Sequence, residues 1–122
     1  MLVQVETVTA LSNVAAIASV EGVDGVFFGP ADLSASMGLL GKAAADSVRS
    51  AIRNGIETVT RAGKAAGVLA ADETHAREYL ACGATFVAVG SDVSLLGKAG
   101  RELLATYKSP PGSRPSARSS AY

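Results

Sequence analysis

The chain has 122 residues and no run of eighteen consecutive apolar residues, which leaves room for one small domain and excludes a transmembrane helix. Eleven Lys and Arg residues balance eleven Asp and Glu residues, so we expect neither a nucleic acid nor a membrane as a partner. The single cysteine, Cys82, excludes an internal disulfide and a multi-cysteine metal site. A cytoplasmic protein is the default expectation.

Hydropathy patterning predicts four β-α units in succession. The predicted strands are 2–5, 25–28, 66–70 and 85–89, and the predicted helices are 9–20, 46–62, 73–82 and 92–107. Two of the strands are apolar almost throughout, which is typical of parallel sheets covered by helices. The pattern predicts an α/β fold, either an open doubly wound sheet or half of a (β/α)8 barrel, whose usual length is about 250 residues.

The long connection, the last helix and the C-terminal segment carry further predictions. Residues 29–45 are predicted to form a long connection. An apolar stripe of the last helix is expected to face the core; it consists of Leu95, Leu96, Ala99, Leu103 and Leu104. Residues 109–122 hold three of the four prolines together with Ser and Arg, which predicts a flexible tail after a domain spanning 1–108.

Four acidic residues follow the predicted strands, where parallel α/β proteins bind their ligands. Asp72 and Asp92 directly precede helices and are interpreted as N-caps. Glu6 and Asp32 fit that explanation less well, since Glu is a poor cap and Asp32 lies well before the next long helix. Two carboxylates at neighbouring strand ends suit Mg²⁺ or Mn²⁺, although two surface acids remain the alternative.

The run Gly-Pro-Ala-Asp-Leu-Ser at residues 29–34 is a candidate anion site. Gly29 lets the backbone approach a ligand, Pro30 restricts the turn, and the amides that follow can form a concave nest for a small carboxylate. An ordinary turn after a strand is the alternative interpretation. No nucleotide-binding glycine motif occurs. His75 is expected at the surface, and Cys82 as a small apolar residue.

Several runs together resemble one known family. They are Gln-Val-Glu-Thr at 4–7, Glu-Gly-Val-Asp-Gly-Val-Phe-Phe-Gly-Pro-Ala-Asp-Leu-Ser at 21–34, and the glycine-led segments 63–70 and 83–92. In order and spacing, residues 2–108 are similar to the last four β-α units of the HpcH/HpaI family of class II aldolases.

This resemblance implies a (β/α)8 barrel lyase that is oligomeric and joins or separates pyruvate and an aldehyde, as in cleavage of 4-hydroxy-2-oxoheptanedioate. It implies a divalent metal ion, Mg²⁺ or Mn²⁺ with Co²⁺ as a further candidate, held by Glu6 and Asp32. It assigns pyruvate binding to the backbone of Gly29, Pro30, Ala31 and Asp32, and places Leu69 on the aldehyde side of the site.

Two catalytic groups of the family have no counterpart in this chain. The histidine base and the arginine at the keto oxygen belong to the first half of the barrel, and His75 does not replace the base. We therefore expect a C-terminal half-barrel, corresponding to strands five to eight, that associates with itself or with the N-terminal half and needs that half for catalysis. Two alternatives remain open: a related 2-keto-3-deoxy sugar-acid aldolase, and a non-catalytic fragment that binds metal and carboxylate or serves assembly.

Overall fold

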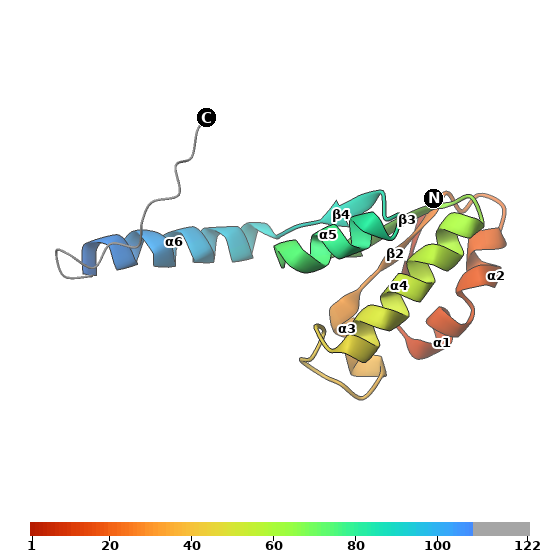
Figure 1. The fold of residues 1–122 in the computed structure, drawn as a ribbon, viewed down its shortest axis with the longest axis horizontal. Coiled ribbons are helices and arrows are strands. Elements are labelled where there is room, and N and C mark those ends of the chain that lie inside the picture. Colours follow the sequence, from red (N-terminus) through yellow and green to blue (C-terminus); the bar gives the residue numbers. More distant parts are fainter. Residues whose placement is uncertain (109–122) are drawn as a thin grey trace. The chain divides into compact units, whose positions relative to one another are not determined.

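A computed structural model describes residues 1–108 (Figure 1). The strands are β1 (Leu2–Val5), β2 (Gly25–Phe28), β3 (Ala65–Leu69) and β4 (Phe86–Ala88); the helices are α1 (Val8–Ser12), α2 (Val14–Ser19), α3 (Pro30–Ser36), α4 (Asp46–Arg61), α5 (Glu73–Ala81) and α6 (Asp92–Lys108). Met1–Val89 form one compact unit, and a second unit with α6 begins at Gly90. The predicted tail at 109–122 lies outside the described residues. No helix described here combines the length and apolarity that crossing a membrane requires.

The four strands form one parallel sheet in the order β1-β2-β3-β4, as the β-α alternation predicts. One row across this sheet runs from Val5 through Phe28 and Val68 to Val87. Parallel pairing brings the carboxyl ends of all four strands to the same edge. Within residues 1–108, β1 and β4 each pair with one strand only, so each leaves an edge of the sheet open.

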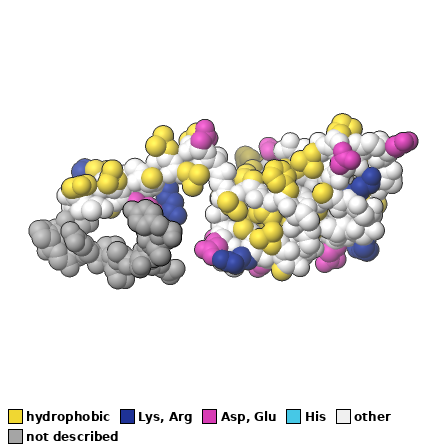
Figure 2. Space-filling view, turned by 90° about the horizontal axis from the view of Figure 1, so that it is seen from above, with side chains coloured by type: hydrophobic (Ala, Val, Ile, Leu, Met, Phe, Trp, Pro, Cys, Tyr) yellow, Lys and Arg dark blue, Asp and Glu magenta, His cyan; other side chains and the backbone are white. Residues whose placement is uncertain are grey.

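The two faces of the sheet differ in burial because successive side chains of a strand point to opposite faces. On the helix side, Val5, Val26, Phe28 and Val68 are completely buried. The opposite face carries apolar side chains that stay half-exposed; they include Leu2 (51% exposed), Leu69 (43%) and Phe86 (53%). Figure 2 shows hydrophobic side chains gathered on the surface of this unit. The sheet therefore has one covered face and one open apolar face.

Helix α4 provides most of the cover for the buried face. Its residues Val48, Ile52, Ile56 and Val59 recur at helical spacing, are fully buried, and belong to the same hydrophobic core as the strands. Gly55 makes room for the ring of Phe28, since a Cβ at that position would lie 2.6 Å from Phe28 Cε1. The helix predicted over 46–62 is thus confirmed, one residue shorter at the end.

Two predicted segments differ from the structure. The single helix expected over 9–20 is divided at Asn13, whose side-chain amide donates to Thr9 O (2.9 Å) and whose backbone leaves the helical region. The connection expected over 29–45 contains α3. Its start has a recognisable signal, since Gly29 is the N-cap and Pro30 the first helical residue.

Helix α6 also departs from expectation. Within the second unit α6 buries none of its residues. That its apolar stripe faces the core stays a prediction. Its N-terminus is capped by Ser91 rather than by Asp92. The Ser94 N–H donates to Ser91 Oγ (3.3 Å) and the Ser91 N–H donates to Ser94 Oγ (3.0 Å), while Asp92 is the first helical residue.

We predict that Phe28→Ala lowers the free energy of unfolding by about 3–5 kcal/mol, because it removes a fully buried ring between the sheet and α4. Denaturant titration followed by circular dichroism measures this change. The control Leu40→Ala alters a side chain that is 80% exposed and should stay within about 0.5 kcal/mol of wild type. Equal losses in both variants would contradict this description of the core.

Candidate metal and carboxylate site

The predicted site residues lie at the carboxyl edge of the sheet. Glu6 directly follows β1, Gly29 directly follows β2, and Leu69 ends β3. Each comes one position after a member of the row formed by Val5, Phe28 and Val68. Three segments that are far apart in the sequence are thus brought into one row by the register of the strands.

The Glu6 side chain is half-buried and lies directly on Gly29. A Cβ at Gly29 would stand 2.8 Å from Glu6 Cγ and would overlap Glu6 Oε1. The same Oε1 accepts a hydrogen bond from Gln4 Nε2 (2.5 Å). A glycine at position 29 is therefore required for this carboxylate to lie across the ends of β1 and β2.

Asp32 lies in the first turn of α3 and is exposed. It forms no hydrogen bond with Glu6 in the described part of the chain. The two are connected through Gly29, which contacts Glu6 and is the N-cap of the helix that carries Asp32. The structure thus places both predicted metal ligands at the same edge of the sheet, on adjacent β-α connections.

The start of α3 also supplies backbone donors. The Gly29 N–H donates to Val5 O (3.3 Å), and the Leu33 N–H donates to Gly29 O (3.0 Å). Pro30 has no N–H, so Ala31 and Asp32 carry the first-turn N–H groups for which an α-helix has no internal acceptor. The turn expected at Gly29 and Pro30 is therefore the beginning of a helix. The backbone N–H groups that were predicted to bind a small carboxylate are still present there.

Ion pairing separates Glu6 and Asp32 from most other acids. Seven of the eleven acidic side chains form ion pairs within residues 1–108, and the remaining four are Glu6, Glu21, Asp32 and Asp92. No group of three or more His, Cys, Asp or Glu gathers in these residues. The carboxylates at the sheet edge are hard oxygen donors that have no cationic partner in the part of the chain that the structure describes. They fit an ion that takes two protein ligands and completes its shell with water and substrate oxygens.

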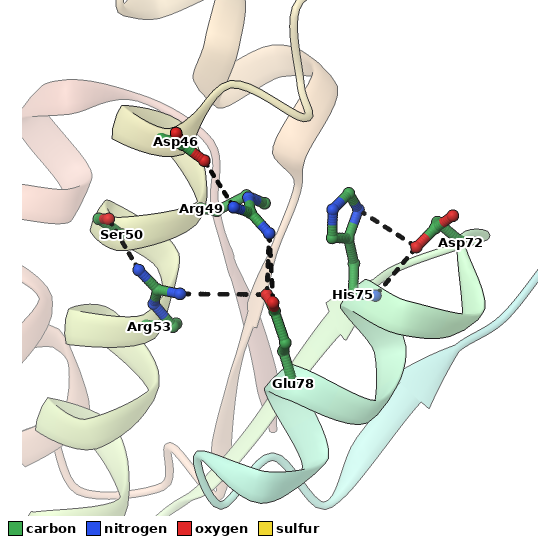
Figure 3. A network of polar contacts seen from close by, with 7 residues as sticks. All are labelled: Asp46, Arg49, Ser50, Arg53, Asp72, His75 and Glu78. Carbon is green, nitrogen blue, oxygen red and sulfur yellow. Dashed lines mark hydrogen bonds and ion pairs between the residues drawn. The ribbon is translucent and has the colours of Figure 1, made fainter.

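A charged network links α4 and α5, and sequence patterns did not reveal it (Figure 3). Arg49 donates to Glu78 (3.0 and 3.3 Å) and to Asp46 (2.5 Å). The hydrogen bond from Arg49 lowers the pKa of the Asp46 carboxyl. Asp46 and Arg49 are three residues apart on one helix and can be paired by spacing, whereas Glu78 lies on another helix and cannot.

The sole histidine belongs to the same region and not to the row of site residues. Asp72 Oδ1 accepts the His75 N–H (3.0 Å), which confirms Asp72 as the N-cap of α5. The imidazole Nδ1 lies 3.6 Å from the same oxygen. The bond from the His75 N–H lowers the pKa of the Asp72 carboxyl. Cys82 is partly buried at the end of α5.

Fold and site together define an α/β protein built as half of a (β/α)8 barrel, with acidic and backbone donors at the carboxyl edge of its sheet. The profile of the HpcH/HpaI aldolase/citrate lyase family matches residues 1–99, and the chain belongs to this family.

Two curated relatives and one solved structure illustrate the match. The chain is 67% identical over 108 residues to a hydroxypyruvate/pyruvate aldolase of Paraburkholderia phytofirmans, covering 88% of this chain and 40% of the relative. It is 50% identical over 107 residues to a 4-hydroxy-2-oxo-heptane-1,7-dioate aldolase of Salmonella arizonae, covering 88% and 41%. A HpcH/HpaI aldolase/citrate lyase family protein from Burkholderia cenocepacia J2315 superimposes with a TM-score of 0.83 and 39% identity, over 88% of this chain and 42% of that one. This chain thus spans less than half the length of these relatives.

We predict that Asp72→Asn destabilises the protein near neutral pH and that its difference from wild type disappears in acid. The folded-state pKa of Asp72 lies below the unfolded value of about 3.9, so its charge stabilises the fold above that value and ceases to do so as the pH falls through the folded pKa. Unfolding titrations of both proteins between pH 7 and about pH 2 measure the difference. A difference that is constant across this range would contradict the role given to the charge.

Proposed function

We propose that this chain supplies the metal-binding and pyruvate-binding half of an aldolase site. The complete site would cleave a 4-hydroxy-2-oxo acid into pyruvate and an aldehyde, and would also catalyse the reverse condensation. The observation that carries the proposal is the Glu6 carboxylate, which lies on Gly29 beside the helix start that bears Asp32 and has no cationic partner within residues 1–108. The names of the two curated relatives support the reaction class.

Glu6 and Asp32 would hold Mg²⁺, Mn²⁺ or Co²⁺ through their carboxylates. When bound, such an ion supplies Lewis-acid stabilisation of the enolate that forms as the C3–C4 bond breaks. The N–H groups of Ala31 and Asp32 would donate to the carboxylate of pyruvate and so orient it. Pro30, which is buried, fixes the start of α3 and therefore the direction of these donors.

Leu69 would contact the aldehyde end of the substrate. It ends β3 on the open face of the sheet, in the same row as Gly29, and remains 43% exposed. An apolar side chain at this position favours binding of the aldehyde's carbon chain without adding a competing metal ligand.

Proton transfer at the 4-hydroxyl needs a group that this chain does not supply. Its only histidine, His75, is engaged by Asp72 at the start of α5. We therefore propose that the base comes from the N-terminal half of the barrel, which would also cover the open apolar face and pair with the free edges of β1 and β4. By itself the chain would bind metal and pyruvate without turnover.

We predict that the chain binds Mn²⁺ and that Glu6→Gln or Asp32→Asn weakens binding at least tenfold, because each substitution removes one of two charged ligands. Titration monitored by electron paramagnetic resonance measures free Mn²⁺ directly. Glu21→Gln is the matched control, since Glu21 is another exposed acid without an ion pair in the described residues and lies outside the site. Unchanged affinity in both site variants would exclude the assignment.

We further predict that pyruvate release from a 4-hydroxy-2-oxo acid requires a supplied N-terminal half. The portion of the P. phytofirmans aldolase that this chain does not match provides such a half. A coupled lactate dehydrogenase assay compares the chain alone, the half alone and the mixture. Only the mixture should turn over, and turnover by the chain alone would show that it holds its own base.

A further inference from the structure

We propose that Gln4 is a positioning residue that orients the Glu6 carboxylate for cation binding. This inference rests on the proposed function. Gln4 and Glu6 are two residues apart on an extended segment, so both side chains point to the open face of the sheet. Gln4 Nε2 donates to Glu6 Oε1 at 2.5 Å.

The contacts of Glu6 are concentrated on one of its two oxygens. Oε1 accepts the amide of Gln4 and is the atom that a Cβ at Gly29 would overlap. In residues 1–108 Oε2 has neither a hydrogen bond nor an ion pair. The amide and the Gly29 backbone therefore fix the orientation of the carboxylate group. Its second oxygen, Oε2, is left available to a cation.

Gln4 lies among apolar residues on the open face of the sheet. Its row across the sheet continues with Phe27, Gly67 and Phe86. The two phenyl rings meet above Gly67 at a centroid distance of 5.6 Å. They can do so because Gly67 has no side chain, since a Cβ there would collide with both rings. The hollow of about 260 Å³ beside them is lined by Leu2, Val3, Gln4, Phe27 and Phe86, and Gln4 is the only polar side chain in that lining. Within residues 1–108, Glu6 is the one residue that accepts a hydrogen bond from the Gln4 side chain.

The chemical type of Gln4 suits this role. A neutral amide donates a hydrogen bond without cancelling the negative charge of the carboxylate, whereas a lysine or arginine would form an ion pair and compete with a metal ion. Partners that orient metal ligands in this way commonly contribute a factor of about 10–100 to metal affinity.

The test compares Mn²⁺ affinities of the full chain carrying Gln4→Met or Gln4→Asn. Methionine keeps the length of the side chain but lacks the donor, and asparagine keeps the amide but is too short to reach Oε1. We expect both variants to lose about 10-fold or more in affinity. Leu2→Met is the matched control, since it introduces the same residue on the same strand and face and should bind Mn²⁺ like wild type. Denaturant titration should show that Gln4→Met unfolds at nearly the wild-type concentration.

The outcomes separate this inference from the proposed function. If wild type does not bind Mn²⁺, or Glu6→Gln binds as well as wild type, the proposed function fails. If Glu6→Gln loses binding while Gln4→Met and Gln4→Asn keep it, only the role of Gln4 is overturned. A loss of affinity in Leu2→Met equal to that in Gln4→Met would also overturn it, because a general disturbance of β1 would then explain the effect.

Discussion

The contact between the Glu6 carboxylate and the backbone of Gly29 is the constraint on which the site depends. It joins the end of β1 to the end of β2 and to the start of α3, which are the three pieces that carry the acidic and backbone donors. Any side chain at position 29 would displace the carboxylate. Because Gly29 is also the N-cap of α3, the same residue determines where the amides of Ala31 and Asp32 lie relative to Glu6.

The distribution of charge across the unit follows a simple division. The acids of α4 and α5 have cationic partners nearby, as Glu78 has Arg49 and Glu73 has Arg77. The acids at the sheet edge are left without such partners within the described residues. Exposed ion pairs within one helix contribute little to stability, whereas the pair of Arg49 with Glu78 joins α4 to α5. The unpaired acids retain the negative charge that a cation site needs.

The open face of the sheet explains why half a barrel is an incomplete unit. The helix-side face buries a continuous core, whereas the opposite face exposes Leu2, Leu69 and Phe86 to water. In a closed barrel such side chains fill the interior, and closure removes the two free strand edges. Leu69 belongs both to this open face and to the edge that carries the proposed site, so association and ligand binding would share part of one surface.

Local periodicity and residue chemistry in the sequence determine several features of the fold. These are the four parallel strands, the buried apolar side of α4 and the helix cap formed by Asp72. The family motifs also predicted Glu6 and Asp32 as the metal ligands. The break at Asn13 and the short helix α3 arise from a local hydrogen bond and from Pro30, which apolar periodicity does not report. The tertiary structure decided the Arg49 network and the contacts that unite Gln4, Glu6 and Gly29. The reason is physical: periodicity reports which face of an element is apolar, but which side chains meet across elements depends on strand register and helix packing, and these bring together residues that the chain keeps far apart.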